Sequence, residues 1–271
     1  MLSYRDLVSG LKQINLDAKM PVIAHASLSS FGEVRGGAEA LMGALLSQVG
    51  GLMMPTFTYK TMITPQEGPA ENGLAYGSAE DQNRMAEFYT PDMPADRLMG
   101  VLAEAVRLHP QAKRSVHPIL SFSGVGVEDA LSAQTLEEPL APIEVLAKQG
   151  GWVVLLGVDH TCNTSLHAAE KRAGRKQFVR WALTDEGVRA CPAFSGCSNG
   201  FEQIAPIVKG ITRFARIGNA EVRALPLTPM LEIAAGLIRE DPLALLCSSP
   251  DCERCQAVRA VTAPGSPLAV G

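Results

Sequence analysis

A strand, a polar turn and a helix follow one another between residues 152 and 170, and this succession constrains the fold more than any other feature. Residues 152–158 (Trp-Val-Val-Leu-Leu-Gly-Val) are an apolar run that predicts a buried strand. The polar residues after it open a helix, on which His167 and Glu170 stand three positions apart on one face. A histidine that titrates near neutral pH beside a carboxylate, at the carboxyl end of a strand, indicates a general base. The alternative is a surface pair with no catalytic role.

Strands and helices alternate along the first 180 residues, which indicates an α/β sheet covered on both faces. Besides 152–158, strands are expected at 21–25 and 51–57, and a turn runs into a strand at 114–122. The expected helices are 4–17, 38–48, 98–109 and 143–148, followed by an edge strand at 178–183 and helices at 201–211 and 228–239. We therefore expect an α/β fold with a central mixed sheet flanked by helices. It forms a single domain over 1–262, and a frayed tail follows at 263–271.

Composition excludes several classes of protein. The chain has 271 residues, of which 46% are hydrophobic and 19% charged, so it can bury a full core and is not a disordered or coiled-coil sequence. A net charge of −4 offers no polycationic footprint for nucleic acid. No apolar run reaches the roughly 18 residues that span a bilayer, and the first residues lack a signal-peptide pattern. We expect a cytoplasmic enzyme that is a monomer or a homodimer.

A loop of small and hydroxyl residues, 26–37, lies between an expected strand and an expected helix. Backbone N–H groups at a helix N-terminus suit phosphates, so the loop is a candidate phosphate site, although a plain connection would look the same. Farther along, Arg114 stands close to hydroxyls and to His117, which is a plausible anion site. Taken alone, His117 could equally be a hydrogen-bonded structural histidine.

Periodicity is lost between about 58 and 97, and a segment this long and irregular predicts a binding loop or lid. Its charge is lopsided, because between residues 61 and 96 Arg84 is the one basic residue against Glu67, Glu71, Glu80, Asp81, Glu87, Asp92 and Asp96. We expect an inserted acidic loop at 61–97 that attracts a polycationic ligand, the alternative being a solvated loop.

Three of the six cysteines lie close together, at Cys247, Cys252 and Cys255. Their C-x4-C-x2-C spacing occurs in ferredoxins, but a fourth cluster ligand would have to follow, and no cysteine does. Cys191 or Cys197 could complete a zinc site only through tertiary folding. We expect reduced thiols at the surface and no bound metal.

Taken together, motifs spread over the chain resemble the aminoglycoside 3-N-acetyltransferase family. They are His25-Ala-Ser-Leu-Ser-Ser-Phe-Gly32, Val34-Arg-Gly-Gly37, Met54-Pro-Thr-Phe57, Met99-Gly100, Arg114-Ser-Val-His-Pro118, Ser121-Phe122, Leu155-Leu-Gly157 and Asn163-Thr-Ser-Leu-His-Ala-Ala-Glu170. The resemblance is close over 20–180 and looser elsewhere. It implies a fold distinct from the common N-acetyltransferase superfamily, acetyl-coenzyme A as donor and a cationic aminoglycoside as acceptor.

The resemblance also implies roles for individual residues. His167 would be the base, Glu170 its partner carboxylate, and Thr164 a hydroxyl that stabilises the oxyanion. The coenzyme would be held by Ser27, Ser29, Ser30, Phe31, Gly32, Val34, Arg35, Gly36, Gly37, Arg114, Ser115 and His117. The acceptor would be held by Tyr59, Glu67, Tyr76, Asp92 and Glu170.

Three hypotheses stay open on the sequence. The first is acetyl transfer to the 3-amine of an aminoglycoside, which confers resistance. The second keeps the fold and donor and changes the acceptor to another amine. The third is a non-catalytic or metal-binding module centred on the C-terminal cysteines. Within the first, we expect direct transfer rather than a covalent route through Cys162, because no motif indicates a reactive thiolate there.

Overall fold

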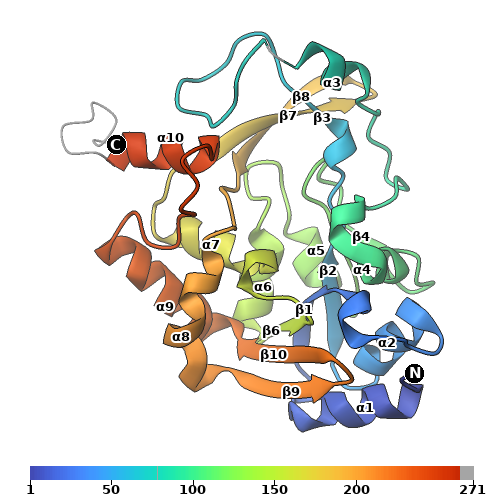
Figure 1. Cartoon of the computed structure of the whole chain (residues 1–271). Coiled ribbons are helices and arrows are strands. Elements are labelled where there is room, and N and C mark those ends of the chain that lie inside the picture. The colour runs from blue at the N-terminus through green and yellow to red at the C-terminus, as the bar shows by residue number, and fades with distance from the viewer. Residues whose placement is uncertain (78, 263–271) are drawn as a thin grey trace.

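A seven-stranded mixed sheet organises the chain, as the sequence predicts (Figure 1). The computed structural model describes residues 1–77 and 79–262, so the tail expected at 263–271 lies outside the described residues. The strand order is β4-β5-β2-β1-β6-β10-β9. β1 (Pro21–Ala26) pairs in parallel with β2 (Gly51–Pro55) and with β6 (Trp152–Leu156). The other strands join antiparallel, namely β4 (Lys113–Arg114), β5 (Phe122–Val125), β9 (Arg213–Ile217) and β10 (Ala220–Pro226).

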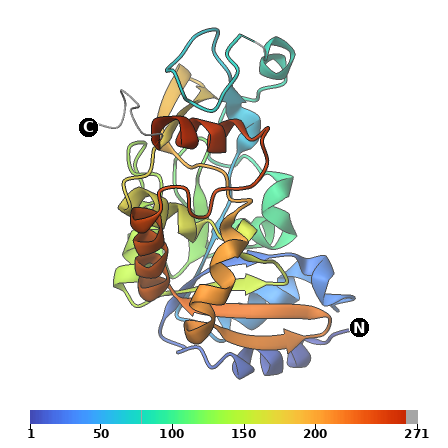
Figure 2. The same cartoon turned by 60° about the vertical axis from the view of Figure 1, so that its left-hand side comes forward.

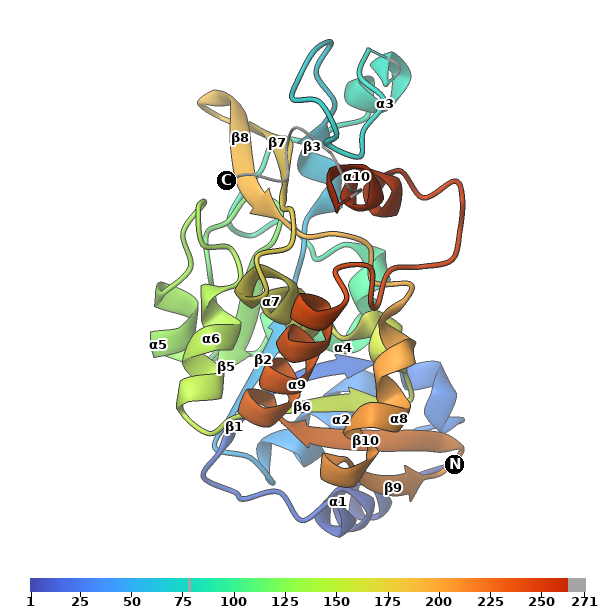
Figure 3. The same cartoon turned by 90° about the vertical axis from the view of Figure 1, so that its left-hand side faces the viewer.

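Each central strand is buried on both faces, which explains its unbroken apolar sequence. Val153 and Leu155 of β6 pack into one core cluster, whereas Val154 and Leu156 pack into the other. One cluster is closed by α1 (Tyr4–Gln13), α2 (Gly37–Leu46) and α4 (Gly100–Arg107). The other is closed by α5 (Glu128–Ser132), α6 (Ala141–Lys148), α7 (Ser165–Arg172) and α9 (Leu227–Glu240), seen side-on in Figure 3.

Helix ends follow local sequence signals. Ser3 and Asp6 form a capping box at the start of α1. The helix ends at Gln13 rather than at the expected residue 17, because Asn15 adopts a left-handed conformation with φ 53°. The helix expected at 201–211 is three short pieces, η5 (Phe201–Ile204), α8 (Ala205–Val208) and η6 (Lys209–Ile211). The helix expected at 228–239 is α9.

A second, three-stranded antiparallel sheet lies at the top of Figure 1, with the order β3-β7-β8. It consists of β3 (Met62–Ile63), β7 (Phe178–Thr184) and β8 (Gly187–Phe194). The expectation of an edge strand at 178–183 is therefore wrong, because β7 is the middle strand of this sheet. α10 (Glu253–Thr262) lies at the same end of the molecule (Figure 2). No helix in the described ranges has the length and apolar content to cross a membrane.

The segment expected as an irregular acidic loop has short elements of its own. η2 (Tyr59–Thr61) leads into β3, and α3 (Glu80–Arg84) and η3 (Arg97–Met99) follow. Several of its carboxylates have local partners. Glu80 and Asp81 face Arg84, and the Glu87 carboxylate binds Lys60.

Candidate active site

The carboxyl end of β6 places the histidine that the sequence singles out. Gly157 leaves the strand with φ 68°, a left-handed conformation that favours glycine. η4 (His160–Cys162) follows, and the Asp159 side chain accepts the Thr161 N–H at 2.9 Å. α7 then begins at Ser165, whose N–H donates to Asn163 Oδ1 at 3.1 Å. The strand-turn-helix succession predicted for 152–170 is confirmed.

His167, Glu170 and Arg175 form a buried chain of charge-assisted hydrogen bonds. His167 Nδ1 donates to Glu170 Oε2 at 2.6 Å, and Arg175 Nη1 donates to Glu170 Oε1 at 2.8 Å. The second terminal nitrogen of this guanidinium, Nη2, donates to the carbonyls of Pro242 and Ala244, at 2.8 and 2.6 Å. Glu170 is 1% exposed. Because Nδ1 is engaged, Nε2 is the nitrogen of His167 that is left to take a proton.

The partners of Glu170 keep it charged. Burial by itself would raise the pKa of this carboxyl, but the hydrogen bond from His167 and the charge of Arg175 outweigh burial and lower it. Glu170 is therefore an anion at neutral pH, so it accepts the hydrogen bond from His167 Nδ1 and fixes the tautomer of that histidine. The pair that the sequence predicted is thus buried and not a surface ion pair.

His167 lies on the wall of a cavity of about 300 Å³ at the carboxyl ends of β1, β2 and β6. The Phe201 ring packs on the imidazole, with the ring centroids 4.8 Å apart. Thr164 and Tyr59 also line the cavity. Burial raises the pKa of Tyr59 to about 12, so its hydroxyl stays neutral. The remaining polar lining comes from His25, Thr161, Cys162, Ser195, Ser198, Asn199 and Arg254.

Two further hollows lie between this cavity and the loop at residues 26–37, which we call the serine loop. One, of about 560 Å³, is lined by Ser27 and Ser30, and the other, of about 650 Å³, by Ser27, Ser29, Gly32 and Val34. Val158 and Cys162 line all three hollows, so the hollows adjoin one another, and we call the two beside the serine loop the serine groove. The loop is held against the end of β6, because Ser30 Oγ donates to the Gly157 carbonyl at 2.8 Å.

The other residues that were expected to hold the coenzyme lie outside the groove, in different parts of the structure. Arg35, Gly36 and Gly37 stand at the start of α2, beyond the lining of the groove, whereas Phe31 is 2% exposed and packs in the core. Ser115 Oγ accepts the Phe122 N–H at 2.8 Å, and His117 Nδ1 accepts two backbone N–H groups. Arg114 donates to carbonyls of Thr56, Pro91 and Met93. These three side chains support the chain around the site, and none lines the groove.

Of the residues expected to hold the acceptor, Tyr59 lines the cavity and Glu170 lies behind its wall. Glu67 and Asp92 are exposed, and Tyr76 is hydrogen-bonded to Asn72, away from the cavity. Within the described part of the chain, the lining includes the Arg254 guanidinium and no carboxylate.

Sequence reasoning missed Arg175 and Arg254. Arg175 follows Gly174, which turns the chain with φ 77° after α7 ends, so helical spacing does not indicate its contact with Glu170. Arg254 reaches the cavity from α10, an element that was not expected. Desolvation and the nearby Asp159 raise the pKa of the Cys162 thiol, which disfavours the covalent route through this residue.

Known proteins are similar to this chain in sequence and in fold. A family model described as aminoglycoside 3-N-acetyltransferase matches residues 23–239. Aminoglycoside N(3)-acetyltransferase III of Salmonella sp is 29% identical over 237 residues, covering 76% of this chain and 79% of its own. Aminoglycoside N(3)-acetyltransferase VII of Streptomyces paromomycinus is 31% identical over 231 residues, covering 78% and 77%. The crystal structure of YokD from Bacillus subtilis superposes with a TM-score of 0.77 at 28% identity, covering 89% and 100%. The chain belongs to the aminoglycoside 3-N-acetyltransferase family.

Proposed function

We propose that the protein transfers the acetyl group of acetyl-coenzyme A to the 3-amine of the deoxystreptamine ring of an aminoglycoside, and so confers resistance. The observation that carries this proposal is the buried His167–Glu170–Arg175 chain, which presents one imidazole nitrogen to a cavity that adjoins the serine groove. Relatives of the same fold have been solved with CoASH and with a gentamicin, which supports a groove for the donor beside a cavity for the acceptor.

The side chains around His167 suit direct transfer. A protonated amine is not a nucleophile, so His167 Nε2 takes its proton as the amine attacks the carbonyl carbon of the thioester. Glu170 stabilises the imidazolium that forms, and Arg175 keeps Glu170 ionised. The new C–N bond replaces the C–S bond, and the coenzyme leaves as a thiol after it takes up a proton. General-base help of this kind is worth about 10²–10⁴-fold in rate.

Thr164 completes the set, because its position on the cavity wall allows its hydroxyl to donate to the developing oxyanion. A preorganised donor of this kind contributes about 3 kcal/mol to transition-state stabilisation. The serine loop, with Ser27 and Ser29 along the groove, would hold the pantetheine and phosphate end of the donor.

One observation favours a second acceptor class. Arg254 lies in the cavity wall, and within the described residues no carboxylate joins it there. An amine substrate that carries an anionic group would meet Arg254 favourably, whereas a polycation would be attracted by Asp159 and Glu221, which line the adjoining hollow. The second candidate function is therefore acetyl transfer to an anionic amine that is not an antibiotic.

A thiol-release assay with acetyl-coenzyme A decides between them. Gentamicin, kanamycin, neomycin and apramycin are compared with amines that carry a carboxylate or phosphonate, and the acetylated position is read by NMR. Release that depends on an aminoglycoside, with the product acetylated at the 3-amine, supports the first function. Release with the anionic amines alone would replace it by the second.

The base is tested by His167→Asn, with His109→Asn as a control away from the site. We expect kcat to fall at least 10²-fold in the first variant and to stay unchanged in the second. Near-normal turnover of His167→Asn would refute the assignment of the base.

A further inference from the structure

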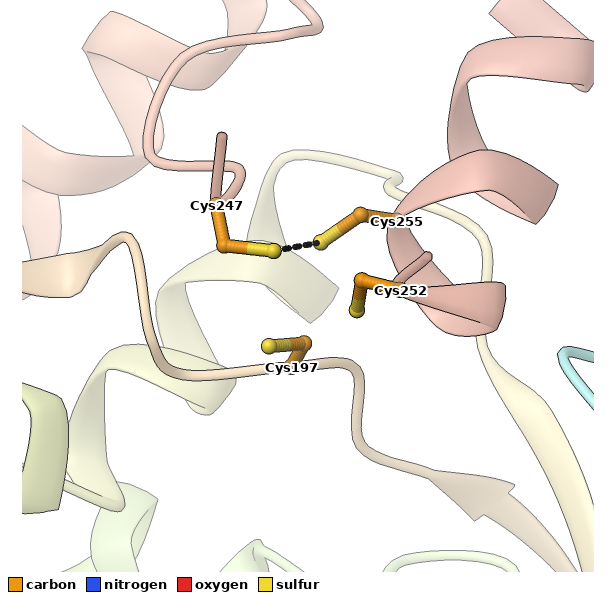
Figure 4. Close-up of side chains that lie close together, drawn as sticks. All are labelled: Cys197, Cys247, Cys252 and Cys255. Carbon is orange, nitrogen blue, oxygen red and sulfur yellow. Dashed lines mark hydrogen bonds between the residues drawn. The ribbon is translucent and has the colours of Figure 1, made fainter. Parts of the chain in front are cut away.

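Four cysteine thiols from distant parts of the chain converge on one point (Figure 4). Cys197 lies in the loop after β8, Cys247 in the segment after α9, and Cys252 and Cys255 at the start of α10. All four sulfur atoms lie within 4.8 Å of one another, and Cys247 Sγ is 3.4 Å from Cys255 Sγ. Cys197 and Cys247 are each 5% exposed and Cys255 is 1% exposed. The expectation of a surface cluster is therefore wrong for Cys247 and Cys255, whereas Cys252 is half-buried.

We propose that Cys197, Cys247, Cys252 and Cys255 bind a structural zinc ion. Zinc favours four thiolates in a tetrahedron with Zn–S bonds of about 2.3 Å, which places the sulfurs about 3.8 Å apart. The observed spacing is close to this value. Cys252 and Cys255, with two residues between them, have the spacing typical of zinc ligands on one turn.

Two other fates of these thiols fit the arrangement less well. A disulfide would join two sulfurs at about 2.05 Å and leave the other two thiols buried without a role. An iron–sulfur cluster distributes its thiolates over several irons, which needs a wider cage than four sulfurs around one point. The fourth ligand precedes the C-x4-C-x2-C group in sequence, so the order of the ferredoxin motif is not reproduced. Cys191 is not a ligand, because its Sγ lies near the Arg189 carbonyl and outside the cluster.

Groups around the cluster offset the negative charge of four thiolates. The Asn199 N–H donates to Cys197 Sγ at 3.4 Å. Arg259 Nη2 donates to the Cys247 carbonyl at 2.6 Å, and Arg254 lies between two of the ligands in sequence. Such outer hydrogen bonds orient thiolate ligands and stabilise them.

The proposed zinc site lies beside the cavity that His167 lines, and its position indicates a structural role for the ion. Four protein ligands leave no open coordination position, so the ion is structural and not catalytic. Cys197 stands between Gly196 and Ser198, which both line the cavity beside His167. Gly196 also accepts a hydrogen bond from Arg254 Nη1 at 2.9 Å. Gly196 also lies against Glu170, because a Cβ built on this glycine would stand 3.6 Å from both carboxylate oxygens of Glu170. The ion would therefore fix α10 and Arg254 to the wall of the acceptor cavity.

Metal content tests the proposal without reference to acetyl transfer. The full chain is purified without an affinity tag from medium supplied with zinc and iron, and metals are measured by mass spectrometry. We expect one zinc per chain in the wild type and in Cys191→Ala, a matched buried cysteine outside the cluster. We expect less than a fifth of that amount in Cys197→Ser and in Cys252→Ser. Cobalt exchanged into the wild type should give the visible spectrum of a tetrahedral thiolate site.

Several results of the same measurements would overturn the zinc proposal. A wild type that carries no zinc, or iron in its place, overturns the proposal, as does full zinc content in Cys252→Ser. Thiol titration of the denatured, unreduced protein should detect six free thiols after chelation, and two or four would establish disulfides instead. If a ligand variant does not fold, the wild-type zinc content and cobalt spectrum still decide. Inactivity toward every amine would refute the proposed function and leave this result standing.

Discussion

At the scale of single residues, the ionisation of Glu170 controls the site. Its carboxylate is almost fully buried and is held between His167 and Arg175, so its charge is balanced on both sides. Replacing Glu170 by glutamine removes the charge and keeps the shape of the side chain, so it separates the electrostatic contribution of Glu170 from its packing contribution. We expect Glu170→Gln to lower kcat at least 10²-fold, because the amide does not stabilise the imidazolium. Acetyl-coenzyme A affinity, measured by calorimetry, should change less than threefold. Turnover within threefold of wild type would show that Glu170 is only a packing residue.

Loss of Arg175 should cost more stability than loss of Arg172, because its ion pair is fully buried. Arg175→Met would leave the Glu170 carboxylate buried beside His167 alone, and breaking a buried pair costs about 3–5 kcal/mol. Arg172→Met is the matched control, because the Arg172–Glu144 pair is partly exposed and such pairs are worth about 1 kcal/mol or less. Urea unfolding of the two variants measures both values. Equal losses would mean that the buried pair has no special role.

The residues of the site differ in how visible they are in the sequence. His167 and Glu170 were predictable, because a spacing of three within one helix fixes their neighbourhood. Arg175 was not, because it reaches Glu170 through a turn at Gly174, and sequence spacing does not describe that turn. Ser115 and His117 occur in a motif that suggested ligand binding, and the structure adds that Ser115 Oγ and His117 Nδ1 accept neighbouring backbone N–H groups.

At the scale of elements, the junction between β6 and the serine loop joins the donor groove to the base. A Cβ on Gly157 would stand 2.5 Å from Ser30 Cβ, and its φ of 68° already disfavours other residues. We expect Gly157→Ala to displace the loop and to weaken acetyl-coenzyme A binding at least tenfold. Gly174→Ala is the control, since it has a similar φ of 77° and nothing within 4 Å of its Cβ. It should lose about 1–3 kcal/mol of stability through backbone strain without losing affinity for the donor.

The strands also differ in how well the sequence predicts them. β1, β2 and β6 were predictable, because strands buried on both faces are continuous apolar runs. β3 has two residues, and β8 contains Pro192 and mostly small side chains without a period-two pattern, so neither gave a signal. Without them the pairing of β7 could not be inferred, and the second sheet was missed.

At the scale of the whole molecule, contacts between distant segments complete the site. Cys197 and Cys255 come together only because α10 returns to the loop after β8, and nothing in local patterning predicts that return. The carboxylates of 61–97 were expected to face a cationic acceptor, whereas several of them pair with nearby Lys60 and Arg84. Composition gives the charge of this segment directly, whereas the partners of Glu80, Asp81 and Glu87 depend on how the chain folds.

Buried histidines spread over the molecule should make its stability depend on pH. Burial lowers the pKa of His25 to about 3 and that of His117 to about 4, and it lowers the pKa of His160 as well. A histidine whose pKa is depressed by folding is protonated first in the unfolded chain, so acid favours unfolding. Stability should therefore be full above pH 6.5 and fall as the pH drops toward 4. For His117 alone the loss between pH 7 and pH 5 is about 2 kcal/mol.

His117→Asn isolates that contribution. The asparagine oxygen can accept the Ile119 and Leu120 N–H groups that His117 Nδ1 accepts at 3.1 and 2.9 Å, and it does not titrate. We expect the variant to lose about 2 kcal/mol less than wild type between pH 7 and pH 5, measured by urea unfolding at each pH. His109→Asn, which removes a less buried histidine, should follow the wild-type profile. If His117→Asn follows that profile too, the buried neutral imidazole at position 117 does not contribute to acid unfolding, and His25 and His160 would have to account for it.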